Sequence, residues 1–130
     1  MAETDSCKFH IAMFPWFAMG HLTPHLHFSN ELAKRGHKIT FLLPKKTQLQ
    51  LQHLNQNPHL ISFHLLTVPH VDGLPLGTET ASDIPFSLSH LLAEAMDLTR
   101  DQVELALSVR KPDFVFYDCA HWIPEKAKKI

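Results

Sequence analysis

Short apolar runs alternate with longer stretches of helical periodicity along the chain. The apolar runs predict four strands, at residues 8–14, 37–43, 61–66 and 113–117. Strands that alternate with helices are typical of βαβ units, in which helical crossovers join parallel strands. The pattern therefore predicts an α/β fold with a parallel sheet and helices on its faces.

Helix signals fall between these runs. The first helix is expected to have Thr23 as its N-cap, with Pro24 in its first turn, and to end before Gly36. A second, Gln-rich helix is expected over residues 45–56. A third is expected over residues 86–109, where apolar residues recur at helical spacing.

Right-handed crossovers would place the strands in the order 3-2-1-4, which is a Rossmann-like, doubly wound sheet. A last helix opens at Trp122, shortly before the sequence stops at Ile130. Complete sheets of this kind usually have more strands. We therefore expect residues 1–130 to be one α/β domain that is truncated at its C-terminal end, with the fourth strand as an exposed edge.

Two residues with acid–base chemistry lie where the first and fourth strands end. His21 comes after the first strand and Asp118 directly follows the fourth. In the order 3-2-1-4 the carboxyl ends of these strands meet at the switch point, where open α/β sheets bind ligands. A carboxylate on one imidazole nitrogen would fix the tautomer and leave the other nitrogen free to accept a proton. The sequence thus predicts a His–Asp pair that activates a substrate hydroxyl.

Each of these residues also has a plainer explanation. A histidine at a strand end is more often a surface or capping residue, and Asp118 could cap the helix that follows it. The run His21, His25 and His27 could suggest a metal site. On a helix, however, positions 21 and 25 share a face while position 27 points elsewhere, so we expect no metal.

The turn after the first strand is aromatic rather than glycine-rich. Trp16 and Phe17 lie past the strand end and are pocket candidates, whereas Phe14 is expected in the core. A dinucleotide-binding turn would carry G-x-G-x-x-G and an acidic residue after the second strand. Here Gly20 stands alone and the second strand leads into two lysines, which disfavours a nicotinamide-dependent oxidoreductase. An apolar acceptor molecule suits this turn better.

Composition narrows the partners and the location. The formal net charge is -1, so no excess of positive charge favours binding to nucleic acid or to an anionic membrane surface. Hydrophobic residues make up 45% of the chain, which is enough to form a core. No apolar run reaches membrane-spanning length, and the N-terminus does not resemble a signal peptide. Cys7 and Cys119 are expected to be free thiols in a reducing compartment. We therefore expect a cytoplasmic protein.

Residues 10–24, 32–44 and 118–124 resemble the plant UDP-dependent glycosyltransferases of the GT-B fold, in their N-terminal, acceptor-binding half. A long loop is expected at residues 67–85, and its residues 71–85 resemble a narrower subgroup. Members of that subgroup add a second sugar to the sugar of a flavonoid or anthocyanin glycoside, and related proteins act on terpenoid glycosides. The resemblance implies an inverting transfer from a UDP-sugar co-substrate to a small-molecule acceptor, without a metal or another cofactor.

By this resemblance, His21 is the general base and Asp118 is its orienting partner. Gly20 would allow close approach of the donor phosphates. The residues that would line the acceptor pocket are Trp16, Phe17, Ala18 and Phe86.

The resemblance also implies that a part is missing. In this family a C-terminal domain with a Trp-, His- and Gln-containing signature segment holds the UDP-sugar, and this sequence has no such segment. We therefore expect the isolated 130 residues to be inactive. The residues themselves leave an alternative open, namely a non-catalytic α/β module that binds a planar apolar ligand or a protein partner.

Overall fold

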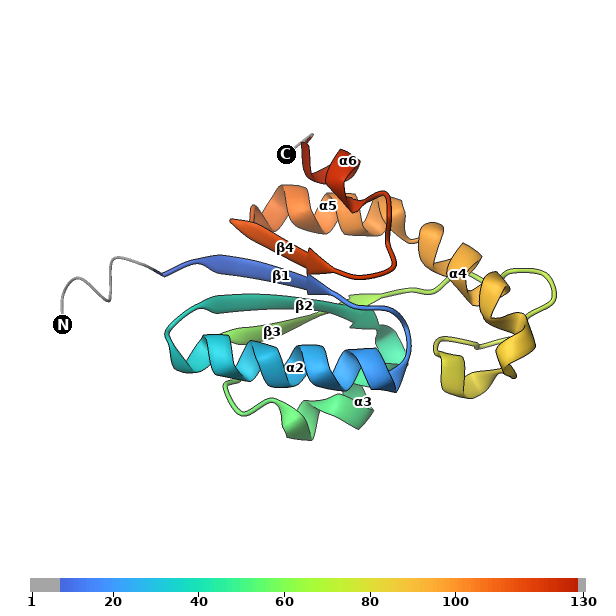
Figure 1. Ribbon diagram of the computed structural model, residues 1–130, viewed down its shortest axis with the longest axis horizontal. Helices are drawn as coiled ribbons and strands as arrows, with labels where there is room; N and C mark the ends of the chain where they lie inside the picture. Colours follow the sequence, from blue (N-terminus) through green and yellow to red (C-terminus); the bar gives the residue numbers. More distant parts are fainter. Residues whose placement is uncertain (1–7, 129–130) are drawn as a thin grey trace.

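The computed structural model describes residues 8–128, and its centre is a four-stranded parallel sheet (Figure 1). The strands are β1 (His10–Phe14), β2 (Lys38–Pro44), β3 (Ile61–Leu66) and β4 (Phe114–Tyr117). Their order is β3-β2-β1-β4, and every neighbouring pair is parallel, which confirms the predicted topology. The prediction of a free thiol at Cys7 lies outside the described residues.

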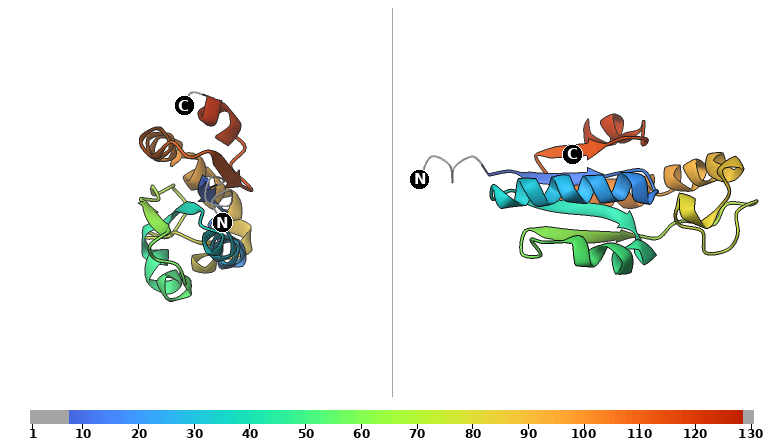
Figure 2. Two further views of the ribbon diagram at one scale, coloured as in Figure 1. Left: turned by 90° about the vertical axis from the view of Figure 1, so that its left-hand side faces the viewer. Right: turned by 60° about the horizontal axis from the view of Figure 1, so that its bottom comes forward.

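Helices cover both faces of this sheet (Figure 2). On one face, α2 (Met19–Lys34) packs in a buried cluster that includes Met13 of β1. On the other face, α5 (Arg100–Arg110) packs in a second cluster that includes Phe14. Successive side chains of a strand point to opposite faces, so β1 contributes to both cores. This two-sided burial accounts for the continuous apolar runs and confirms the doubly wound arrangement.

Strand β4 is an exposed edge of the sheet, as predicted. Phe114, Phe116 and Tyr117 are 48%, 37% and 38% exposed. A groove of about 440 Å³ lies beside this strand, between it, the end of α5 and α6 (Ile123–Lys128). Strands of parallel sheets are normally buried on both faces, and β4 departs from that rule.

Helix α2 begins at Met19, earlier than the predicted N-cap at Thr23. Ala18 is the N-cap, in an extended conformation, and its carbonyl accepts the N–H of His21 at 2.9 Å. Pro24 lies inside the helix, where it has no N–H to donate to the carbonyl four residues back. The correction matters because it places His21 in the first turn of a helix rather than in a loop.

The helices predicted at residues 45–56 and 86–109 are each broken into shorter pieces. The pieces are α3 (Gln48–Leu51), α4 (Ser89–Asp97), α5, and 3₁₀ turns at Lys45–Thr47, Gln52–Leu54 and Phe86–Leu88. The Thr47 and Thr99 hydroxyls each donate to a carbonyl three residues back, at 2.6 Å. Such side-chain bonds compete with a continuous helix. None of the helices within residues 8–128 is long and apolar enough to cross a membrane.

Gly36 ends α2 in a conformation that other residues rarely adopt. Its φ is 91°, its N–H donates to the Ala33 carbonyl, and the next N–H, of His37, donates to the Leu32 carbonyl. These two bonds form a Schellman motif, which satisfies the last carbonyls of the helix. A Cβ at Gly36 would also lie 2.8 Å from the Lys8 side chain.

Two glycine substitutions should therefore have opposite effects on stability. We expect Gly36→Ala to lower the free energy of unfolding by about 1–2 kcal/mol, because it forces a side chain into the left-handed region. Gly20→Ala should leave it unchanged or raise it by up to about 1 kcal/mol, because Gly20 is helical and a Cβ there meets nothing within 4 Å. Urea denaturation measures both values. Equal losses for the two variants would contradict this account.

Candidate active site

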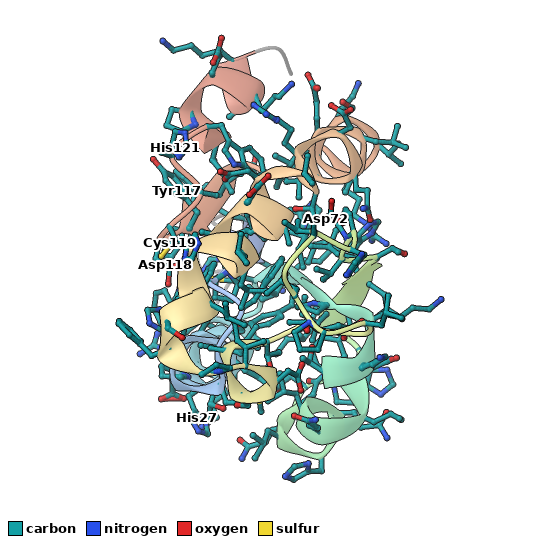
Figure 3. The ribbon with its side chains drawn as sticks, turned by 90° about the vertical axis from the view of Figure 1, so that its right-hand side faces the viewer. His27, Asp72, Tyr117, Asp118, Cys119 and His121 are labelled. Carbon is teal, nitrogen blue, oxygen red and sulfur yellow. The ribbon has the colours of Figure 1, made fainter. Side chains whose placement is uncertain are left out.

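The carboxyl edge of the sheet brings His21 and Asp118 together. Strand β1 pairs with β4 so that Phe14 lies opposite Tyr117, and the chain leaves both strands at the same edge. His21 is in the first turn of α2 and Asp118 follows β4 directly. The distance from His21 Nδ1 to Asp118 Oδ2 is 2.7 Å. Figure 3 views this edge of the sheet and labels Asp118 among the residues that follow β4.

Three donors converge on the Asp118 carboxylate. Besides the His21 contact at Oδ2, Oδ1 accepts the backbone N–H groups of Trp16 and Cys119, both at 2.7 Å. Partial burial works to raise the pKa of Asp118. The hydrogen bonds from His21, Cys119 and Trp16 together outweigh burial and hold the pKa below its usual value. Asp118 is therefore ionised at neutral pH and fixed in direction by two backbone segments.

This arrangement determines which nitrogen of His21 can react. An ionised carboxylate only accepts hydrogen bonds, so the proton of neutral His21 is on Nδ1. Nε2 is then the basic atom, and it has no hydrogen-bond partner within residues 8–128. The His21 side chain is 47% exposed, so a ligand can reach it. A hydroxyl placed at Nε2 could give up its proton there while Asp118 stabilises the imidazolium that forms.

The predicted acceptor-side residues differ in how exposed they are. Trp16 and Ala18 are half-buried beside the first turn of α2, and Phe86 is 92% exposed at the end of the long loop. Phe17 is expected to line the acceptor pocket, but its side chain is fully buried in the core. It packs edge-on against Phe14 and stacks on Trp16, with ring centroids 6.1 Å apart in both pairs. Phe17 therefore supports Trp16 from behind instead of presenting its own surface.

The other candidate residues lie on α2 or directly after Asp118. Gly20 is exposed in the first turn of α2, with open space around it. His25 donates Nδ1–H to the His21 carbonyl, and His27 is exposed on the same helix (Figure 3). In the described part of the chain, no three His, Cys, Asp or Glu side chains are grouped so as to hold a metal ion. Partial burial and the neighbouring Asp118 raise the pKa of the exposed Cys119 thiol, which disfavours its thiolate.

Two supports of the site had no signal in the sequence. The Trp16 and Cys119 hydrogen bonds to Asp118 come from backbone N–H groups, so the identities of these residues do not predict the bonds. The Trp122 indole N–H donates to Asp97 Oδ1 at 2.8 Å and ties the segment after Asp118 to the end of α4. A buried tryptophan needs such a partner, but the sequence does not say which residue supplies it.

The lowered pKa of Asp118 predicts how stability depends on pH. A carboxyl whose pKa is lower in the folded state stabilises the fold above its unfolded value, here near 3.8. That contribution is lost as pH falls through the still lower folded value. We expect the free energy of unfolding of the unsubstituted chain to fall more steeply on acidification below about pH 5 than that of Asp118→Asn. Urea denaturation across this range measures the difference, and parallel curves would refute it.

Comparison with known proteins gives close relatives over nearly the whole chain. No family model matches. UDP-glycosyltransferase 79B9 of Arabidopsis thaliana is 63% identical over 122 residues, which is 94% of this chain and 27% of that protein. An anthocyanidin 3-O-glucoside 2'''-O-xylosyltransferase of the same plant is 60% identical over 128 residues, which is 98% of this chain and 27% of that protein.

Solved structures agree on the fold. Arabidopsis thaliana UGT89C1 complexed with UDP-L-rhamnose superposes with a TM-score of 0.86 at 24% identity, over 95% of this chain and 34% of that one. Glycyrrhiza uralensis UGT73P12 superposes with a TM-score of 0.78 at 21% identity, over 93% of this chain and 26% of that one. The chain thus spans about a quarter of the length of its curated relatives. Over that quarter it is homologous to the plant UDP-glycosyltransferases, as the resemblance of its sequence predicted.

Proposed function

We propose that this chain supplies the acceptor-binding, base-carrying part of an inverting UDP-sugar glycosyltransferase. The observation that carries the proposal is the His21–Asp118 contact of 2.7 Å, which leaves Nε2 of an exposed imidazole free. The acceptor is a hydroxyl of a flavonoid glycoside or a similar small molecule. The xylosyltransferase relative, whose name specifies a glucoside acceptor, supports this choice.

The reaction needs one proton acceptor and one leaving group. Nε2 of His21 takes the proton of the acceptor hydroxyl as that oxygen attacks the anomeric carbon of the UDP-sugar. The bond from the anomeric carbon to the UDP oxygen breaks, UDP leaves with the electron pair, and the configuration inverts. Asp118 accepts the hydrogen bond from Nδ1–H and stabilises the positive charge of the imidazolium. The UDP-sugar is a co-substrate, and no resident cofactor or metal takes part in this scheme.

The neighbouring residues are assigned to two sides of His21. Trp16, Ala18 and Phe86 form the acceptor side, with Phe17 behind Trp16. Gly20 lies on the donor side, where the lack of a side chain lets phosphate oxygens approach the start of α2. Crystal structures of UGT89C1 with UDP-L-rhamnose and with quercetin, which share this fold, support a site that serves both ligand types. The rest of the donor site belongs to the part of the relatives that this chain does not span.

A chimaera tests the function directly. The segment would replace the matching quarter of the xylosyltransferase relative, and transfer to that enzyme's own acceptor would be measured. We expect the chimaera to be active and His21→Ala to lower its kcat by about 10²–10⁴-fold, because general-base catalysis contributes that much. His27→Ala is the matched control, since His27 is an exposed histidine of the same helix. If His21→Ala kept full turnover, the segment would be a binding module and not part of the catalytic machinery.

The chain on its own should not turn over. We expect the isolated 130-residue chain, mixed with a flavonoid glucoside and a UDP-sugar, to release no UDP above the rate without protein. The reason is that this chain would contact the UDP-sugar from one side only. A coupled assay for UDP measures this. Release that depends on His21 in the isolated chain would show that the donor site is already complete.

A further inference from the structure

Glu79 is a buried carboxylate that the proposed chemistry does not use. It is only 8% exposed, although it belongs to the long loop at residues 67–85. Its Oε1 accepts the backbone N–H of Lys46 at 2.7 Å, across 33 residues of sequence. Lys46 lies in the first turn after β2, where backbone N–H groups lack partners within their own helical segment. Glu79 thus caps that segment from the loop.

The neighbouring loop residues are fastened at further points. The Gly77 carbonyl accepts the Lys46 ammonium at 3.2 Å. Asp83 Oδ2 accepts the N–H groups of Glu79 and Thr80, at 3.0 and 3.1 Å. The Asp83 N–H in turn donates to the Thr80 side chain, which completes a capping box. Residues 79–83 therefore form one hydrogen-bonded unit, which Glu79 attaches to the turn after β2, and the nearby Gly77 carbonyl makes a second contact with that turn.

This unit also reaches the turn that carries the candidate acceptor side. The Ala81 N–H donates to the Phe17 carbonyl at 2.9 Å, next to Ala18. Ile84 and Leu88 pack on the same core cluster as Phe17, whereas Phe86, which lies between them in the sequence, is exposed to solvent. The His21–Asp118 pair is held by other groups and shares no hydrogen bond with the loop unit.

We propose that Glu79 is a positioning residue, which holds the long loop against the carboxyl edge through the Lys46 N–H and thereby sets the acceptor side of the site. The role in acceptor binding rests on the proposed function. The attachment of the loop to the turn after β2 by the hydrogen bond from the Lys46 N–H to Glu79, here called the clasp, does not depend on it. Because no hydrogen bond joins the loop unit directly to His21 or Asp118, we expect loss of the Glu79 carboxylate to weaken acceptor binding and to leave the proton transfer intact.

Hydrogen exchange of the 130-residue chain, read by NMR, tests the clasp without any activity. We expect Glu79→Ala to speed exchange of the Lys46 and Ala81 amides by about tenfold or more, since each loses a hydrogen bond or its support. Glu79→Gln should restore protection, because its amide oxygen can still accept the Lys46 N–H. Asp72→Ala, an exposed acidic residue of the same loop (Figure 3), should change neither amide. Unchanged exchange in Glu79→Ala would overturn the proposal.

Kinetics of the active chimaera test the acceptor role. Glu79→Ala should raise the KM for the acceptor by about tenfold and change kcat and its pH profile by less than about twofold. Glu79→Gln should return the KM to the unsubstituted value, and Asp72→Ala should not alter it. A fall in kcat with unchanged KM would overturn the positioning role. An inactive unsubstituted chimaera would remove the proposed function and the acceptor role together, while the exchange result would still decide the clasp.

Discussion

The parallel pairing of β1 with β4 is the constraint on which the candidate site depends. These strands are separated by about a hundred residues of sequence, yet Phe14 lies opposite Tyr117. Only that register lets Asp118 reach both the Trp16 N–H and the His21 imidazole. A shift of the register along the strands would move the carboxylate by about 3.3 Å per residue, which exceeds the range of a hydrogen bond.

The Asp118 carboxylate contacts His21 and also links the ends of two strands. Its Oδ2 orients His21, while its Oδ1 ties the ends of two strands together through backbone N–H groups. Burial of a carboxylate is unfavourable unless such donors compensate for lost water. The three donors do so here, and the pKa of Asp118 lies below its usual value in spite of partial burial. Strand pairing thus gives the proposed base, His21, a fixed and ionised partner.

The sequence predicts the parts of this arrangement that follow from periodicity and topology. Strand order and the approach of His21 to Asp118 come from right-handed crossovers, which hold for nearly all parallel sheets. The sequence predicts the start of α2 too late, because Thr23 and Pro24 are strong start signals whereas the observed N-cap, Ala18, makes no side-chain capping hydrogen bond. The sequence does not predict the burial of Phe17, because this burial depends on α4, α5 and the long loop, which are distant in sequence. Local rules cannot report contacts of that kind.

The proposed base and the proposed acceptor side are therefore supported by different physical means. Backbone donors at two strand ends fix the His–Asp pair, and these donors are present whatever side chains the neighbouring positions carry. The proposed acceptor side is bordered by the long loop, in which Glu79 and Asp83 accept hydrogen bonds from the backbone N–H groups of Lys46 and Glu79. Substitutions in the loop would then reshape the surface beside Trp16 without moving His21. Such a separation would let one base serve different acceptor-binding surfaces, because changes in shape and changes in reactivity do not have to occur together.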